Sequence, residues 1–252
     1  MGGFTLSNDF NPYAAPSTPG GFGPPEPIGS GSIVPTIADA GSVINYAWDV
    51  WKANLGFLVG ITVVVFALNI GVSFVQGIVG AIFERQEGLL AILNLTLSLI
   101  SYLIQTFIGI GQAQIILKLL RGQPAQFGDL FSGGPWFFPI LGATIIAALA
   151  AGLGFALCIV PGIILSLFFW PFYFLIVDQK TTALESFGVA RTFAQPNAGT
   201  TFVLWAASVG IMIVGFLALC VGVLFAAPLV SLIWGTAYLQ MSGQLAARPQ
   251  YQ

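Results

Sequence analysis

The sequence predicts an all-α, polytopic membrane protein with six transmembrane helices, arranged as three hairpins with interfacial helices on the cytoplasmic side. Of its 252 residues, 57% are apolar and 6% are charged, whereas ordinary soluble domains are about 25% charged. Residues 130–177 contain no charged residue. As one helix they would run about 70 Å, more than twice a hydrocarbon core of about 30 Å, so this segment must fold back on itself.

The same composition excludes several classes of function. The chain has no histidine, which removes His-based acid/base catalysis, Ser-His-Asp triads and imidazole metal sites. Its two cysteines cannot form a four-thiolate metal site. Seven basic and nine acidic residues give a net charge of −2, without the clustered Lys and Arg of a nucleic-acid surface. We therefore expect no enzymatic activity, no cofactor, no metal site and no nucleic-acid partner.

The N-terminal segment differs from the rest of the chain. Residues 1–38 hold seven of the 15 prolines and seven of the 31 glycines. Such a segment cannot bury enough apolar surface to offset its ordering entropy, so we expect a disordered tether. The remaining chain divides into a six-helix transmembrane domain at 39–241 and a short polar tail at 242–252.

An amphipathic helix is expected from Ser42, as its N-cap, to about Asn54. Apolar residues recur at helical spacing on one face, and this face includes Trp48 and Trp51. Indole rings suit the headgroup boundary, where an amphipathic ring is partly wet. We therefore expect this helix to lie flat on the membrane before the first span.

The first two hairpins follow directly. A short polar turn at 84–87 separates apolar stretches at 55–83 and 88–117. The central hairpin turns at 158–162, because Pro161 lacks the amide that a continuing helix needs and Gly162 accepts turn dihedrals.

A capping box is predicted after the central hairpin. Thr182 and Glu185 have the spacing at which hydroxyl and carboxylate satisfy each other's backbone amides, so a helix should run from there to about Ala194. The last hairpin is expected within 201–219 and 221–239.

In this arrangement, each of the two cysteines lies at the end of a span that runs from the cytoplasmic side to the outer side. Cys158 and Cys220 should lie at similar membrane depth. We expect reduced thiols rather than a disulfide, since a disulfide needs Cα atoms within about 7 Å and buried free cysteine commonly behaves as a small hydrophobe.

The basic residues predict the orientation. In a six-span arrangement only Arg85 lies on one side of the membrane. Lys and Arg are retained on the cytoplasmic side, so we expect a bacterial inner-membrane protein with both termini in the cytoplasm. The six residues on that side are Lys52, Lys118, Arg121, Lys180, Arg191 and Arg248.

A polar stripe marks the second span. Its members fall within about 60° of the helix circumference, at 100° per residue. The stripe is either a polar path for a solute or a set of interhelical hydrogen bonds, and we favour the hydrogen bonds because no carboxylate lies within it. Its members are Asn94, Ser98, Ser101, Gln105 and Gln112.

Charged residues cluster at the expected cytoplasmic boundary. They are candidates for an acid/base set or an oxygen-ligand metal site, but nothing in their spacing requires either. Salt bridges between loop helices and span ends are the ordinary explanation, and the basic members can also touch anionic lipid headgroups. These interface charges include Asp129, Asp178, Lys180, Glu185 and Arg191.

Four polar landmarks carry a resemblance to a family. They lie at 118–131, 160–163, 174–178 and 183–187. These segments resemble a group of uncharacterised bacterial integral membrane proteins, which are similar to the membrane domain attached to some glycerophosphoryl diester phosphodiesterases. The resemblance covers roughly residues 40–240 and implies a six-helix membrane domain. It brings no catalytic residue, because in the fused proteins the activity belongs to a separate soluble barrel.

Two hypotheses about function follow. The first is a non-enzymatic structural or accessory membrane module, whose partners are membrane lipids and an unidentified membrane protein. The alternative is a small-solute transporter that uses the polar stripe. A membrane-embedded enzyme is the least favoured, because candidate catalytic groups are few and scattered.

Overall fold

The computed structural model describes residues 33–157, 159–179, 181–218 and 221–245. Every element of secondary structure in these ranges is a helix, which confirms the all-α prediction. In chain order the helices are α1 (Ala40–Ala53), α2 (Leu55–Phe83), α3 (Glu87–Leu120), η1 (Phe127–Phe131), η2 (Gly134–Trp136), α4 (Phe137–Leu157), α5 (Ile159–Phe169), α6 (Phe172–Gln179), α7 (Ala183–Ala194), α8 (Ala198–Leu217) and α9 (Val221–Met241).

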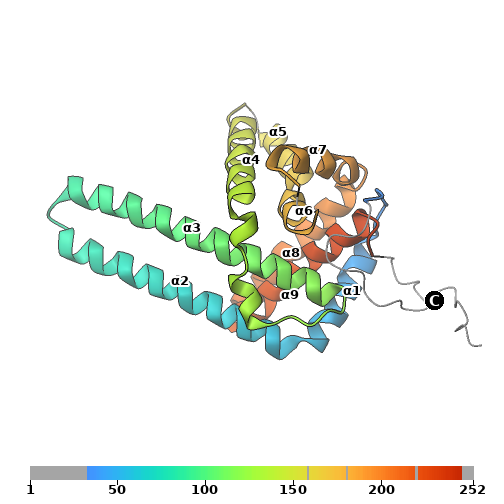
Figure 1. Ribbon diagram of the computed structural model, residues 1–252, viewed down its shortest axis with the longest axis horizontal. Coiled ribbons are helices and arrows are strands. Elements are labelled where there is room, and N and C mark those ends of the chain that lie inside the picture. Colours follow the sequence, from blue (N-terminus) through green and yellow to red (C-terminus); the bar gives the residue numbers. More distant parts are fainter. Residues whose placement is uncertain (1–32, 158, 180, 219–220, 246–252) are drawn as a thin grey trace, which may run out of the picture.

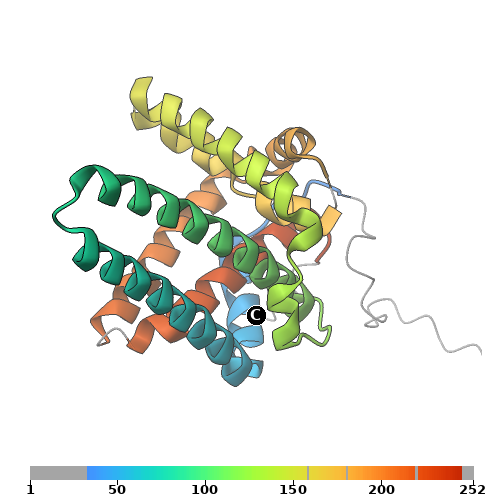
Figure 2. The ribbon, with the colours of Figure 1, turned by 60° about the vertical axis from the view of Figure 1, so that its left-hand side comes forward.

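Three pairs of helices form hairpins that spread from a shared end of the molecule (Figure 1). The pairs are α2 with α3, α4 with α5, and α8 with α9. In Figure 2 the ends at which α2 adjoins α3, α4 adjoins α5 and α8 adjoins α9 lie toward the left, and η1 and α7 lie toward the right. We call the region formed by α1, η1, α6, α7 and the adjoining ends of α3 and α9 the base.

Within the described ranges, five stretches are long and apolar enough to cross a membrane, at 55–83, 87–120, 127–156, 198–217 and 221–241. Their length and composition indicate a multi-pass membrane protein. In the most apolar windows of α2 and α3, 11% and 6% of the residues are buried within the protein, against 50% for α9. α9 is therefore the central helix of the fold, whereas α2 and α3 present large apolar surfaces outward that only a bilayer would cover.

The return arm of the central hairpin is broken in two. α5 ends at Phe169 and α6 begins at Phe172, with Pro171 between them, because proline cannot donate the hydrogen bond of a continuing helix. α4, which ends at Leu157, and α5, which begins at Ile159, pack against each other as a hairpin, but the predicted turn at 158–162 was wrong in its bounds, because Pro161 and Gly162 lie within α5. Pro161 lies in the first turn of α5, where its missing amide has no helical partner to lose.

The first helix begins earlier than its sequence predicts. Asp39, rather than Ser42, is the N-cap, and its carboxylate accepts a hydrogen bond from the amide of Ser42 at 2.8 Å. Aspartate and serine are both good N-cap residues. With Asp39 as the N-cap, Ser42 is the third residue of the helix. There the Ser42 hydroxyl donates to Gln240 of α9 at 2.9 Å.

The apolar face of α1 packs onto α9 rather than lying only on lipid. Val43 and Ala47 are fully buried. The indoles of Trp48 and Trp51 stack with their centroids 4.8 Å apart, and the Trp51 Nε1 donates to the carbonyl of Phe225 at 3.1 Å. This helix is thus a part of the base.

Residues 33–38 belong to the body, although their composition places them in the tail. The amides of Val34 and Thr36 donate to the carbonyls of Ser242 and Met241, at 3.0 and 2.9 Å. The fully buried Ser242 likewise begins the segment expected to be a polar tail. Both flanks are therefore anchored where they adjoin the base.

Two local predictions are confirmed. α7 has the capping box formed by Thr182 and Glu185, and it ends at Ala194 as expected. Other expectations fall outside the described residues, namely those for the segment at 1–32, Cys158, Lys180, Cys220 and Arg248.

Candidate functional site

A network of polar side chains joins three helices within the base. Arg121, which ends α3, donates from Nη1 and Nη2 to the two carboxylate oxygens of Asp178, at 2.7 and 2.9 Å. The Asp178 side chain is 0% exposed and that of Arg121 is 12% exposed. A planar guanidinium matches a carboxylate in this two-bond geometry, which makes it one of the stronger ion pairs in proteins.

Two uncharged groups complete this network. The Tyr238 hydroxyl of α9 donates to Asp178 Oδ2 at 2.8 Å. Gln244 donates from Nε2 to the Tyr238 hydroxyl at 3.2 Å, and its Oε1 accepts from Arg121 Nη2. The network therefore ties α3, α6, α9 and the segment after α9 together, and we call these four side chains the base network.

The other interface charges are placed as follows. Lys118 pairs with Asp129 of η1 at 2.7 Å, so two of the predicted carboxylates form salt bridges with the end of α3. Glu185 is part of the capping box of α7. Its carboxylate accepts a hydrogen bond from the Thr182 amide, which holds the pKa of this carboxyl below its usual value. Arg191 is exposed. Within the ranges that the structure describes, no three carboxylates or thiols gather as metal ligands would.

The polar stripe on α3 is divided between exposed and buried positions. Asn94, Ser98 and Gln105 are exposed on the part of the hairpin far from the base, whereas Ser101 is buried. Ser101 accepts a long hydrogen bond of 3.4 Å from Gln76 of α2, which is an interhelical contact of the kind that we favoured for the stripe.

Two members of the stripe face a small cavity. Gln105 and Gln112, with Asn69 of α2, line a space of about 120 Å³ between the two helices, and the other residues that line it are apolar. The stripe therefore makes an interhelical contact at Ser101 and faces this small space at Gln105 and Gln112.

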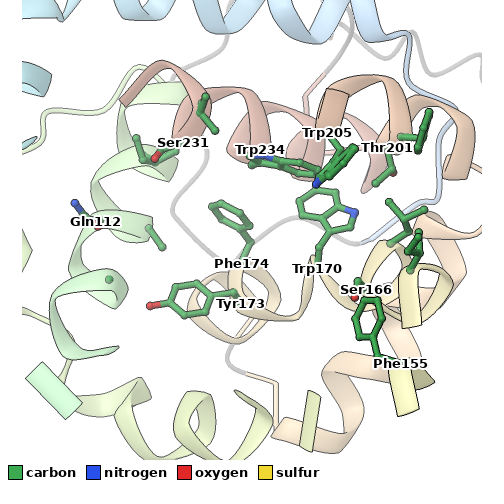
Figure 3. Close-up of a pocket in the computed structure, with 17 residues that line it drawn as sticks. Gln112, Phe155, Ser166, Trp170, Tyr173, Phe174, Thr201, Trp205, Ser231 and Trp234 are labelled. Carbon is green, nitrogen blue, oxygen red and sulfur yellow. The ribbon is translucent and has the colours of Figure 1, made fainter. Parts of the chain in front are cut away.

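A second, larger cavity of about 690 Å³ lies between α3, α4, α5, α6, α8 and α9. Figure 3 shows the indoles of Trp170, Trp205 and Trp234 gathered on one side of it, with Thr201 beside them. Tyr173, Phe174 and Gln112 lie toward its other side. The complete lining is Gly109, Gln112, Ala113, Ile116, Phe155, Ile163, Ser166, Leu167, Trp170, Tyr173, Phe174, Thr201, Phe202, Trp205, Val230, Ser231 and Trp234.

Comparison with known proteins gives no relative. No protein-family model, curated protein or solved structure matches this chain. Three of the four polar landmarks of the sequence, at 118–131, 174–178 and 183–187, contribute to the base, where they supply Arg121, Asp178 and the α7 cap.

Sequence reasoning missed the large cavity and half of the base network. Tyr238 and Gln244 lie in or beside an apolar run, where nothing marks them as partners of Asp178. A signal for the cavity was present, however. Pro171, next to Trp170, predicts a break in the helix of the charge-free segment. At this break Trp170, Tyr173 and Phe174 line the space between α3 and α9.

Proposed function

We propose that this chain is a non-enzymatic accessory module of a bacterial inner membrane, which organises lipid around three inserted hairpins. The observation that carries the proposal is the contrast between the two ends of the molecule. The base is held by the buried Arg121–Asp178 pair, whereas the hairpins spread apart and expose large apolar side chains. Lipid chains would fill the spaces between the hairpins, since these surfaces have no protein cover.

The basic residues support insertion from the cytoplasm. Lys52, Lys118, Arg121 and Arg191 belong to the base or adjoin it, and Arg85 lies at the turn of the α2–α3 hairpin. Positive charge is retained on the cytoplasmic side, so the base and both termini face the cytoplasm.

A sixth span completes the proposed arrangement. α5 and α6 together cover residues 159–179, which at about 1.5 Å per residue is about 30 Å, the thickness of a hydrocarbon core. α3, α4 and α7 pack against α6 beside the break at Pro171, and Trp170 contacts Trp234 of α9, so protein surrounds the break, which is the condition for irregular backbone at membrane depth. The family resemblance to phosphodiesterase membrane domains implies the same six-helix plan.

Native mass spectrometry of the full chain, released from nanodiscs of zwitterionic and anionic phospholipid, tests the role. We expect the protein to carry several phospholipids that survive release from the nanodisc. Protein that emerges free of lipid at energies that leave it folded would contradict a lipid-organising role. A stoichiometric polar solute in place of lipid would favour the transporter.

The transporter remains the second candidate because one residue touches both cavities. Gln112 lines both the small cavity between α2 and α3 and the large cavity of about 690 Å³. If the stripe carries solute, proteoliposomes should show a flux that Gln105→Leu abolishes while the fold is kept. If it is packing, Gln105→Leu should change stability by no more than about 1 to 2 kcal/mol and no flux should be seen.

A further inference from the structure

The large cavity has features of a binding site that the lipid-organising role does not use. Its volume of about 690 Å³ lies within the roughly 300–1,000 Å³ of small-molecule sites. Residues from six helices form it, and the α5–α6 break supplies part of its aromatic wall. A space of this size between spans would hold one ligand rather than bulk lipid.

Two polar atoms in this lining have no partner. The Trp170 Nε1 and the Thr201 Oγ1 are buried and make no hydrogen bond. Thr201 is 0% exposed, and both residues line the cavity, where Figure 3 labels them on the side at which the indoles gather. An indole N–H can only donate, and an unsatisfied donor is costly at membrane depth. The ligand should therefore present hydrogen-bond acceptors at this place.

The lining also defines the charge and shape of the ligand. None of the residues found to line the cavity is charged, so a phosphate would lie there without a cation to compensate it. Trp170 meets Trp234 edge to face with centroids 4.6 Å apart, and Phe174 lies 6.4 Å from Trp170. Such rings favour a flat conjugated ring in stacked or edge-to-face contact.

The cavity opens sideways toward hydrocarbon. Phe202 and Trp205 of α8 are 53% and 51% exposed, and Phe155 and Ile163 of the central hairpin are 48% and 43% exposed. These exposed apolar residues form a rim of the cavity on the side that would face the bilayer. A hydrocarbon tail can leave through this rim without passing a polar surface.

From these features we infer that the cavity binds a neutral membrane lipid with a flat, carbonyl-bearing ring and a hydrocarbon tail, that is, a quinone-type lipid. The ring lies among the tryptophans, its carbonyl oxygen accepts from Trp170 Nε1 and Thr201 Oγ1, and its tail extends through the rim. The inference rests on the membrane placement proposed above, but it adds a specific ligand to it.

Quenching of tryptophan fluorescence tests this inference with the full chain in nanodiscs. Three of the six tryptophans line the cavity, so titration with decylubiquinone should quench part of the emission saturably. Decylbenzene, which has the tail and a ring but no carbonyl, should not displace it. Equal displacement by decylbenzene, or quenching that rises linearly without saturation, would overturn the inference.

Two substitutions then test the donors. Trp170→Phe and Thr201→Val each remove one donor while keeping much of the side-chain shape, and each should weaken binding about three- to tenfold. Trp48→Phe, on α1 outside the cavity, should leave the affinity unchanged. Unchanged affinity in both cavity variants would contradict the assigned contacts. If neither variant folds, the comparison of the two probes on the unaltered protein still decides.

The outcomes separate the two proposals. Protein that retains phospholipid in native mass spectrometry but shows no saturable quenching leaves the lipid-organising role intact and refutes the quinone-type ligand. Displacement of decylubiquinone by an anionic phospholipid would also refute it, because the cavity would then accept a charged head.

Discussion

Arg121 holds both carboxylate oxygens of Asp178, 57 residues further along the chain, at the point where α3, α6 and α9 meet. This pair is nearly dry, since the Asp178 side chain is 0% exposed. The end of the first hairpin is thereby fixed to the return arm of the second, and Tyr238 fixes the third hairpin to the same carboxylate.

Asp178→Asn should destabilise the protein strongly. It keeps the shape of the side chain but leaves the Arg121 cation without its counter-charge, and breaking a buried pair costs about 3 kcal/mol or more. SDS-induced unfolding in mixed micelles measures this loss. The matched control is Asp49→Asn, because the Asp49–Lys52 pair is 48% and 54% exposed and should be worth at most about 0.5 kcal/mol. Equal losses in the two variants would show that the base network does not hold the hairpins.

Tyr238→Phe should cost less than Asp178→Asn. The hydroxyl donates to Asp178 and accepts from Gln244, and removing a hydrogen bond to a charged group costs about 1.5 to 3 kcal/mol. The ring itself stays, stacked on Phe174 with centroids 5.6 Å apart. A loss as large as that of Asp178→Asn, by the same unfolding measurement, would mean that the ring rather than the hydroxyl is what matters.

Gly111→Ala should prevent α3 from packing on η1. A Cβ at this position would collide with the backbone carbonyl of Leu130, which cannot move aside as a flexible side chain could. We expect loss of folded protein by size-exclusion chromatography in detergent. Gly142→Ala on α4 is the control, because nothing lies within 4 Å of its added Cβ, and alanine in a helix should stabilise by roughly 0.5–1 kcal/mol. Normal folding of Gly111→Ala would disprove the close approach.

The α7 cap should make this helix sensitive to acid. Because hydrogen bonds from Thr182 lower the pKa of Glu185, the carboxylate stabilises the helix above its ordinary pKa of 4.5. This contribution is lost as the pH falls from that value through the lowered pKa. The protection factors of the α7 amides, which correct the exchange rates for the intrinsic effect of pH, should therefore fall in that window. Thr182→Ala should cost about 1 kcal/mol at neutral pH and reduce this acid effect. An acid effect that is unchanged in Thr182→Ala would contradict it.

Local features of this fold are readable in the sequence, whereas contacts between distant segments are not. The α7 cap depends on two residues three positions apart, so Thr182 and Glu185 predict it fully. The predicted start of α1 was wrong because Asp39 and Ser42 are both good N-cap residues. The hydrogen bond of Ser42 with Gln240, 198 residues away, keeps Ser42 inside the helix.

The candidate site shows the same limit. Arg121 and Asp178 could be recognised as boundary charges, but only the meeting of α3 and α6 pairs them. Tyr238 appears in the sequence as one more aromatic residue of a span. The large cavity depends on six helices, and the hydropathy of each helix alone says nothing about the space between them.

Cysteine-accessibility labelling at two positions tests the membrane arrangement most directly. Gln86 lies at the turn of the first hairpin and Gln195 at the end of α7, and both are exposed. In a Cys158→Ala, Cys220→Ala background, single cysteines placed at Gln86 and Gln195 are labelled with a membrane-impermeant reagent on intact cells. With six spans, α3, α4 and the α5–α6 arm separate the two positions, so Gln86 should be labelled from outside and Gln195 only after the membrane is opened. Labelling of both from the same side would mean that the α5–α6 arm does not cross, and would contradict the three-hairpin account.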